Sequence, residues 1–361
     1  MKILLRDSNL PETAPLTRFR SVFNLRNGIY SEIERLKIAS PEAEFYFRHP
    51  DLSYEIIISR MENFQSYSEN KIPDDQFDLV IESQHLSPFR MLNHVRESIE
   101  KDIPLFTYRG NYFTGAGIVS GEMLPPPLKN LSELTLIGPE DQLFFHEDIE
   151  ILPGSVFDMR KGPIVLDAGV SISPFTYIEG PLYAGKNARL DNARITGGCI
   201  LGHEVRAGGE IENSIFNDFS NKHHEGFVGH SVLGSWVNLG ALATTSDLKN
   251  NYGEVRLLLP EGDPMGSDLI EIPGGTIKFG SIIGDSVKIS IGTMLYTGTV
   301  IDAGANVFGG NPQKYIPPLS WGLDGSLYRK DRFLKDQETI YKRRNQEPHP
   351  DLKNLIDLLQ P

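Results

Sequence analysis

The stretch IKFGSIIGDSVKISIGTMLYTGTVIDAGANV, residues 277–307, decides the fold of this chain. Every sixth residue in it is aliphatic, and small or β-branched residues recur four places after these positions. The aliphatic series is Ile277, Ile283, Ile289, Leu295, Ile301 and Val307. The second series is Ser281, Val287, Thr293, Thr299 and Ala305. A period of six residues therefore governs the stretch.

This period is incompatible with the two commonest elements. An α-helix, with about 3.6 residues per turn, would send each aliphatic side chain to a new face. A plain strand of period two would not single out every third apolar position. A triangular coil of short strands needs one inward aliphatic residue per strand, so we predict a left-handed parallel β-helix over residues 145–315. An ordinary β-sandwich is the alternative, but six hexads in register are hard to reach by chance.

Two segments interrupt the repeat. Residues 213–227 break the hexad and place His223 and His224 together in a turn. Residues 246–275 are rich in Asp, Asn, Pro and Gly, and we expect them to leave one corner of the coil as a long loop. Long loops in compact domains are usually functional or disordered, so we expect the chemistry at these breaks.

The flanking regions have a different pattern. Residues 1–140 alternate strand-like and helix-like segments, which predicts an α/β domain with a mainly parallel sheet. The expected strands are 1–5, 43–47, 77–81 and 103–108, and the expected helices are 28–37 and 91–101. The proline run 125–127 is a plausible linker, and residues 316–361 are expected to form a tail with helices.

Composition limits the classes of partner. The net charge of −13 argues against broad binding to nucleic acid or anionic membranes, which needs a positive face. The single cysteine, Cys199, excludes an intramolecular disulfide and fits a reducing compartment. The apolar run near Met1 is too short for a signal peptide, and no stretch is long enough to span a membrane. We therefore expect a cytoplasmic protein.

The histidine turn suggests a type of chemistry. Left-handed β-helices of this kind are mostly acyl- or acetyltransferases whose active sites form between neighbours in a trimer. Histidine titrates near neutrality and can deprotonate an amine or hydroxyl as it attacks a thioester. A surface or metal-binding histidine pair is the alternative.

Three segments follow one another in a fixed order: SNKHHEGFVG at 220–229, LGSWVNLGA at 233–241 and NNY at 250–252. This series resembles the acetyltransferase half of the bifunctional N-acetylglucosamine-1-phosphate uridylyltransferase/glucosamine-1-phosphate acetyltransferase family. The resemblance implies that His224, five residues before Gly229, is the catalytic base. It implies further roles for Asn251 and Tyr252 in holding the acceptor, Ala241 beside the acyl group and Thr293 beside coenzyme A.

A divergent, sugar nucleotidyltransferase-like branch of that family is similar over most of the chain. The shared stretches are RFRSVFNLRNGI at 18–29, LKNNY at 248–252 and PPLSWG at 317–322. Two family positions differ, because a tyrosine is replaced by Phe227 and a lysine by Glu212. We therefore expect the charge for a substrate phosphate to come from other cations, namely Lys222, Lys249 and Arg256.

The N-terminal domain departs further from the family. A nucleotidyltransferase needs a Gly-x-Gly-Thr-Arg turn for a triphosphate, whereas residues 6–18 contain no glycine. Thr17, Arg18 and Arg20 could be its remnant, and Asp7, Asp78 and Asp102 are the aspartates available for Mg²⁺. We expect a degenerate domain that needs Mg²⁺ only if it is active.

The prediction is an acetyl-CoA-dependent N-acetyltransferase of the cell-envelope precursor type. Its acceptor is expected to be an amino-sugar phosphate or a nucleotide sugar, its assembly a homotrimer, and it is expected to have no metal site. The alternatives are a sugar-1-phosphate nucleotidyltransferase whose β-helix only oligomerises the chain, and a non-catalytic scaffold. A third, a γ-carbonic-anhydrase-like metalloenzyme, would need zinc ligands from among His203, His223, His224 and His230.

Overall fold

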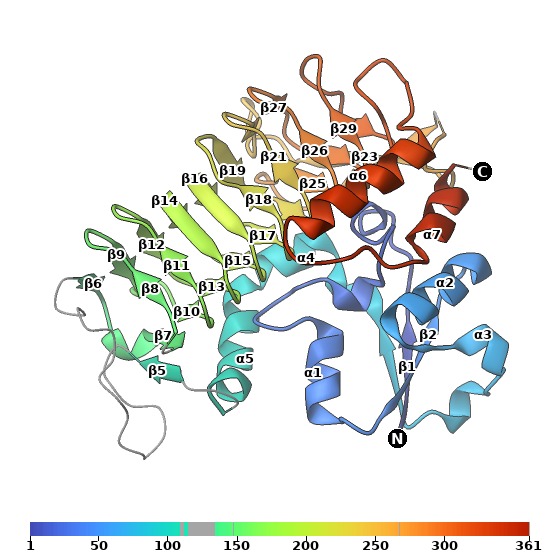
Figure 1. Ribbon diagram of the computed structural model, residues 1–361, viewed down its shortest axis with the longest axis horizontal. Coiled ribbons are helices and arrows are strands. Elements are labelled where there is room, and N and C mark those ends of the chain that lie inside the picture. Colours follow the sequence, from blue (N-terminus) through green and yellow to red (C-terminus); the bar gives the residue numbers. More distant parts are fainter. Residues whose placement is uncertain (109–111, 115–133, 147, 267, 361) are drawn as a thin grey trace.

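A computed structural model describes residues 1–108, 112–114, 134–146, 148–266 and 268–360. The chain forms an α/β unit, a long parallel β-helix and two C-terminal helices (Figure 1), which confirms the predicted fold class. The expected linker at 125–127 lies outside the described residues. No helix in the described ranges is long and apolar enough to cross a membrane.

The N-terminal unit contains a parallel sheet in the order β3-β2-β1-β4. Its strands are β1 (Lys2–Arg6), β2 (Glu44–Arg48), β3 (Gln65–Ser66) and β4 (Leu79–Glu82). The helices are α1 (Glu32–Ala39), α2 (Leu52–Glu62), α3 (Tyr67–Asn70), α4 (Pro88–Asn93) and α5 (Val95–Tyr108). The central strand β1 is explained by its run of Ile3, Leu4 and Leu5, which are all fully buried. Helix α1 begins where Ser31 and Glu34 form a capping box.

One expected strand is wrong. Residues 103–108 continue helix α5 instead of forming a strand. Val95, Ile99 and Phe106 recur at helical spacing and are buried, and Phe106 meets Tyr183 of the β-helix edge to face. The apolar residues of 103–108 therefore belong to a helix that packs against the β-helix. A short apolar run of this kind cannot be assigned to a helix or a strand from its local pattern alone.

The β-helix has three parallel faces. The first face contains β7 (Leu143–His146), β10 (Ile164–Leu166), β13 (Leu182–Ala184), β15 (Cys199–Leu201), β17 (Ile215–Phe216), β20 (Val232–Leu233), β25 (Ser281–Ile283), β28 (Thr299–Ile301) and β30 (Tyr315–Ile316). The second contains β8 (Glu150–Ile151), β11 (Ser171–Ile172), the first parts of β14 (Arg189–Thr196) and β16 (Arg206–Glu212), then β18 (Asn221–Lys222), β21 (Asn238–Leu239), β26 (Lys288–Ile289) and β29 (Asn306–Val307). The third contains β6 (Thr135–Ile137), β9 (Val156–Asp158), β12 (Tyr177–Glu179), the second parts of β14 and β16, β19 (Phe227–Gly229), β22 (Thr244–Thr245) and β27 (Met294–Leu295). A short strand, β5 (Tyr112–Thr114), pairs antiparallel with β7.

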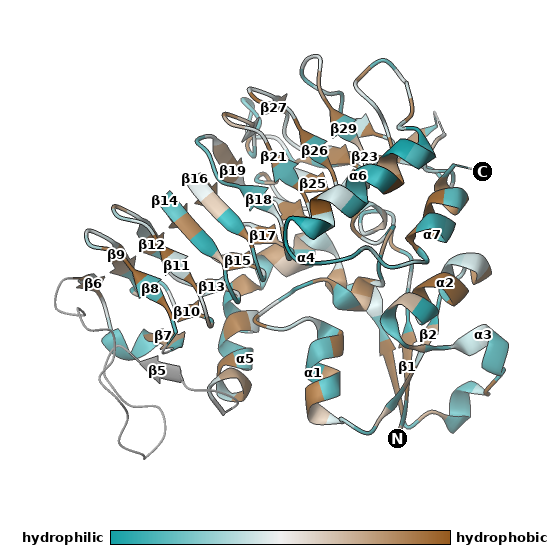
Figure 2. Ribbon diagram, viewed as in Figure 1, coloured by the Kyte–Doolittle hydropathy of each residue, from teal (hydrophilic) through white to brown (hydrophobic). Residues whose placement is uncertain are grey.

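The hexad residues fill the axis of this coil. Ile283, Ile289, Leu295, Ile301 and Val307 are buried in one hydrophobic cluster (Figure 2 shows the apolar residues along these strands). Burying such a side chain is worth about 1.5–3 kcal/mol. Ile277 is the exception, with 50% of its surface exposed, because the chain rejoins the coil only at β25.

The interruption at 246–275 is more ordered than the expected loop. It carries an antiparallel hairpin of β23 (Arg256–Pro260) and β24 (Leu269–Pro273). The alternating residues Val255, Leu257 and Leu259 are buried, which is the period-two pattern of a strand with one covered face. The hairpin leaves the coil at the corner between its third and first faces.

The N-terminal unit covers the outer side of the first face. Val165, Tyr183, Ile200, Ile215, Val232, Ile282 and Val300 point away from the axis and share a hydrophobic cluster with Val22, Phe23, Leu25 and Ile99. The predicted ranges 1–140 and 145–315 divide the two units along the sequence. In the folded chain the two units share a hydrophobic core. The tail supplies the expected helices α6 (Lys330–Lys342) and α7 (Leu352–Leu359).

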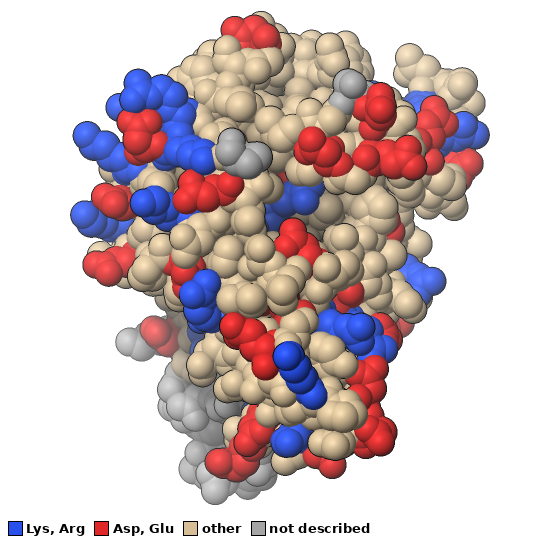
Figure 3. Space-filling model, turned by 90° about the vertical axis from the view of Figure 1, so that its right-hand side faces the viewer, with Lys and Arg blue, Asp and Glu red and all other residues tan. Residues whose placement is uncertain are grey.

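Acidic and basic side chains are interspersed on the surface that includes the C-terminal helices. Figure 3 shows this side of the molecule with Lys and Arg placed among Asp and Glu, and without a broad surface of one sign. This face therefore has no broad positive surface that would bind an extended polyanion. The net charge of −13 is unfavourable for such binding as well.

Candidate functional site

The histidine turn lies at the corner between the second and third faces of the coil. It joins β18 to β19 and carries His223, His224 and Glu225. The next coils place Leu242 and Gly292 at the same corner, where the Leu242 amide donates to the Glu225 carbonyl at 2.7 Å and the Gly292 amide to the Ala241 carbonyl at 2.8 Å. His224, Ala241 and Thr293 are thus brought to successive coils of one edge.

Thr293 faces inward at this edge. Its side chain is buried, and its hydroxyl donates to the Ser290 carbonyl at 2.9 Å. Ala241 is half-buried and adds only backbone groups. Any ligand at these two positions would therefore meet mainly the backbone of the corner, not polar side chains.

Lys222 does not have the surface position that we expected. Its side chain is buried, and its ammonium group donates to the carbonyls of Gly208 at 2.8 Å and His224 at 2.5 Å. Burial lowers the pKa of Lys222 to about 8. This lysine holds the histidine turn from inside, so the expectation that it meets a substrate phosphate is corrected.

Of the two histidines in the turn, His223 is the one with a carboxylate neighbour. Its Nδ1 lies 3.1 Å from Oδ2 of Asp191, two coils earlier, although the two atoms are not aligned as a hydrogen bond. The other carboxylate oxygen of Asp191 accepts from the Ser173 hydroxyl at 2.6 Å. Gly208 lies between them, where an added Cβ would come within 2.0 Å of the His223 carbonyl oxygen.

His224 is exposed and rests edge to face against His223, with ring centroids 4.9 Å apart. No described residue forms a hydrogen bond with its imidazole. The exposed ring is free to meet a substrate, while its neighbour is restrained by Asp191. Sequence reasoning missed Asp191 because its contact with His223 spans two coils and no short motif contains both.

Asn251 and Tyr252 lie in a turn at the start of the interruption. The Asn251 side chain accepts from the Gly253 amide at 3.0 Å, and Tyr252 adopts a left-handed φ of 55° with 68% of its surface exposed. Arg256 begins the hairpin and pairs with Glu271 at 2.8 Å. Arg256 and Glu271 line a hollow that none of the histidine-corner residues line. Within one chain the two groups of expected site residues are not brought together.

That hollow is a cavity of about 430 Å³. It is lined by Lys249, Gly253, Glu254, Arg256, Leu258, Glu271 and Lys314. Lys249 and Arg256 were expected to carry charge for a phosphate. Lys314 was missed, because it follows the last regular hexads and approaches Lys249 only in the folded chain.

The arginines expected as a nucleotide-binding remnant face the β-helix. Arg18 pairs with Asp302 at 2.9 Å and Arg20 with Asp285 at 2.7 Å. Further along the same loop, Arg26 pairs with Asp218 at 3.1 Å. Each aspartate follows the first-face strand of its coil, so the three carboxylates line one corner. These arginines are engaged by the protein itself, which corrects their assignment to a triphosphate.

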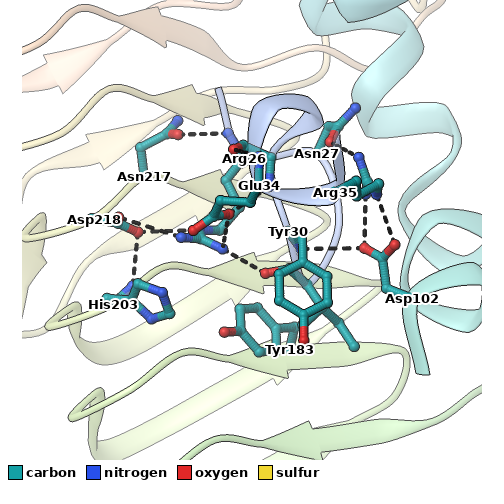
Figure 4. A network of polar contacts seen from close by, with 12 residues as sticks. Arg26, Asn27, Tyr30, Glu34, Arg35, Asp102, Tyr183, His203, Asn217 and Asp218 are labelled. Carbon is teal, nitrogen blue, oxygen red and sulfur yellow. Dashed lines mark hydrogen bonds and ion pairs between the residues drawn. The ribbon is translucent and has the colours of Figure 1, made fainter. Parts of the chain in front are cut away.

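Figure 4 shows how Arg26 anchors a wider network at this corner. The Arg26 amide donates to the Asn217 side chain at 2.9 Å, and its guanidinium reaches both Asp218 and Glu34. The His203 amide donates to the same Asp218 carboxylate at 2.8 Å. His203 therefore belongs to a structural network at a different corner of the coil from the histidine turn.

The aspartates considered for Mg²⁺ do not converge. Asp102 is held by Arg35 at 2.7 Å, and Asp78 accepts from the Lys2 amide at 2.7 Å. Asp7 is buried and accepts from Asn9 and Ser83, and burial raises its pKa. Among the described residues, no three His, Cys, Asp or Glu side chains gather as a metal site would require. The residues present do not fit a Mg²⁺ site.

No family model matches the chain. Curated relatives named bifunctional protein GlmU do match it. The protein from Bartonella bacilliformis is 28% identical over 172 residues, 44% of this chain and 38% of the relative. The protein from Methylibium petroleiphilum is 28% identical over 159 residues, 43% of this chain and 29% of the relative. The protein from Nitrosomonas europaea is 32% identical over 130 residues, 35% of this chain and 28% of the relative.

The chain is similar to bifunctional protein GlmU over part of its length, and these matches support a divergent GlmU-like family. This confirms the family resemblance found in its motifs. The GlmU-like chain spans well under half the length of the relatives it matches, 38% of the first and 29% of the second.

Proposed function

We propose that this protein transfers an acetyl group from acetyl-CoA to the amine of an amino sugar that carries a phosphate or a nucleotide. The observation that carries the proposal is the alignment of His224, Ala241 and Thr293 on successive coils of one edge. The GlmU-like motifs that contain His224 and Ala241 support the same assignment.

His224 acts as the general base. Its exposed imidazole accepts a proton as the amine nitrogen bonds to the thioester carbonyl carbon, and the carbon–sulfur bond then breaks to release coenzyme A, which takes up the proton. A positioned base contributes roughly 10²–10⁴ in rate. A backbone amide near Ala241 steadies the oxyanion, and such a donor is worth about 3–4 kcal/mol. Asn251 and Tyr252 position the acceptor.

We propose that the active assembly is a homotrimer. Large apolar side chains are exposed along the corner that carries His224: Phe175 is 79% exposed, Leu242 63% and Ile291 76%. A row of this kind is costly in water and is typical of a protein interface. A neighbouring chain at this edge would cover the row and could bring its own Asn251 and Tyr252 toward His224, which one chain alone does not achieve.

The first test uses two donors. The purified protein is incubated with acetyl-CoA, or with nucleoside triphosphates, and in each case with a panel of amino-sugar phosphates. We expect acetyl transfer, because Arg18 and Arg20 are engaged by aspartates. Nucleotidyl transfer without acetyl transfer would overturn the proposal in favour of a sugar-1-phosphate nucleotidyltransferase.

His224→Ala tests the assignment of the base. We expect kcat for acetyl transfer to fall by roughly 10²–10⁴. The matched control is His94→Ala, since His94 is an exposed histidine at the end of α4. A His224→Ala protein that keeps full acetyl transfer would refute the mechanism.

A further inference from the structure

The 430 Å³ cavity beside the hairpin collects positive charge from three separate segments. Lys249 belongs to the start of the interruption, Arg256 to strand β23, and Lys314 to the connection that leads into β30. No local motif joins them, because Lys314 lies 58 residues from Arg256 and 65 residues from Lys249 in the sequence. The fold alone produces this cluster.

The two lysines have no acidic partner in the described part of the chain. The Lys249 ammonium group donates to the backbone carbonyl of Glu254, and the Lys314 ammonium group to that of Thr297. Carbonyl groups orient these ammonium groups without neutralising them. Burial lowers the pKa of Lys314, and the nearby charge of Lys249 lowers it further.

The carboxylates in the cavity are already engaged. Glu271 pairs with Arg256 at 2.8 Å, and Glu254 accepts from the Gly275 amide at 2.8 Å. Three cations therefore face two carboxylates, and both unpaired cations are lysines. Two like charges held close together are unfavourable unless an anion joins them, and lysine is a common phosphate ligand that acts as a point charge.

We propose that this cavity binds a phosphate monoester between Lys249 and Lys314, with Arg256 at its rim. The binding claim stands on the cavity alone, while the identity of the phosphate rests on the proposed acetyl transfer. That phosphate belongs either to the 3′-phosphate of the acyl donor or to the 1-phosphate of the sugar acceptor. Both sources share the same dianionic chemistry.

Direct binding is tested with inorganic phosphate and the full chain, by calorimetry. Lys314→Gln and Lys249→Gln should each raise Kd about tenfold or more, as expected for loss of a charged hydrogen bond. Lys335→Gln, on the polar surface of α6, is the control and should leave Kd unchanged. Equal Kd values in all four proteins, each with an unchanged melting temperature, would overturn the proposal.

The source of the phosphate is then resolved by kinetics. If the acyl donor supplies it, Lys314→Gln raises KM for acetyl-CoA but not for its 3′-dephospho form. If the acceptor supplies it, the variant raises KM for an amino-sugar 1-phosphate but not for the free amino sugar. Absence of acetyl transfer in every protein would overturn the proposed function and leave the phosphate-binding result to decide the cavity.

Discussion

Asp191 and His223 meet across a space that only glycine leaves open. Gly208 lies between their two coils, and any side chain there would displace the backbone that carries His223. The contact fixes the ring against which His224 rests. Asp191 thus restrains the histidine turn from an earlier coil, while Lys222 restrains it from the interior of the coil.

Asp191→Asn should reduce acetyl transfer through kcat. The variant keeps the size of the side chain but removes the charge that faces His223, so the orientation of the histidine pair becomes less restricted. We expect kcat to fall by roughly tenfold to a hundredfold, part of what a positioned base contributes, with KM unchanged. Steady-state kinetics measures both values.

Asp191→Glu is the companion variant, because it retains a carboxylate and should recover part of the lost kcat. A higher KM and a lower kcat together with a lower melting temperature would show that Asp191 only supports the fold. Unchanged kcat in Asp191→Asn would contradict its role in positioning the histidines.

At the scale of elements, the N-terminal loop is attached to the coil by buried charges. Asp302 and Asp285 are almost fully buried, and both accept from arginines of the loop. The Ser235 amide also donates to Asp285 at 2.6 Å. The aspartates at this corner would repel one another if they were unpaired. The arginines are therefore required for the N-terminal unit to cover the first face.

Arg20→Met should destabilise the protein by about 3–5 kcal/mol, because it leaves the Asp285 carboxylate buried and unpaired. Urea unfolding followed by circular dichroism measures the change. Arg96→Met removes an exposed pair with Glu100 and should leave the free energy of unfolding nearly unchanged, because solvent screens the pair. Equal losses in the two variants would contradict the proposed importance of burial.

The double variant Arg20→Met/Asp285→Leu sharpens this test. It removes both charges and should recover much of the stability lost in the single variant, since an unpaired buried charge no longer exists. If the double variant is less stable than Arg20→Met, the pair contributes more than the relief of an unpaired carboxylate.

At the scale of the whole molecule, the exposed apolar edge predicts self-association. Leu242→Glu/Ile291→Glu places charges in the row of apolar side chains and should convert a trimer to monomers. We expect acetyl transfer to be lost with the trimer. Size-exclusion chromatography with light scattering measures the mass.

The control for this experiment is Leu358→Glu, which changes an exposed leucine on α7, away from that edge. It should leave the mass unchanged. A wild-type chain that is monomeric at micromolar concentration and still transfers acetyl groups would refute the trimer.

The β-helix could be predicted because each hexad of the regular stretch contains one aliphatic residue that packs at the axis of the coil. The exception was Ile277, whose spacing matches the series although the chain has not yet re-entered the coil. Local periodicity also could not identify the end of α5, since its apolar residues are positioned to pack against the β-helix, which lies far away in the sequence.

The candidate site was only partly predictable. His224, Ala241 and Thr293, which the resemblance singles out, lie on one edge because adjacent coils convert a sequence order into a spatial row. Their roles stay a prediction. Burial of Lys222 could not be foreseen, since nothing nearby in sequence indicates that its ammonium group is met by carbonyl groups. Asp191 and Lys314 depend on contacts between distant coils, and no local pattern encodes them.

The ladder of Arg26, Arg20 and Arg18 has a consequence for how the chain folds. Its three contacts span 192, 265 and 284 residues, so all three are complete only after the coils up to Asp302 have formed. Contacts of such long range slow folding, because loop entropy is lost before the contact is gained. The three aspartates line up only when the coils between them are stacked in register. We therefore expect the N-terminal loop to dock late in folding. It should not dock on a coil whose strands have slipped in register, because the aspartates would then not face the arginines.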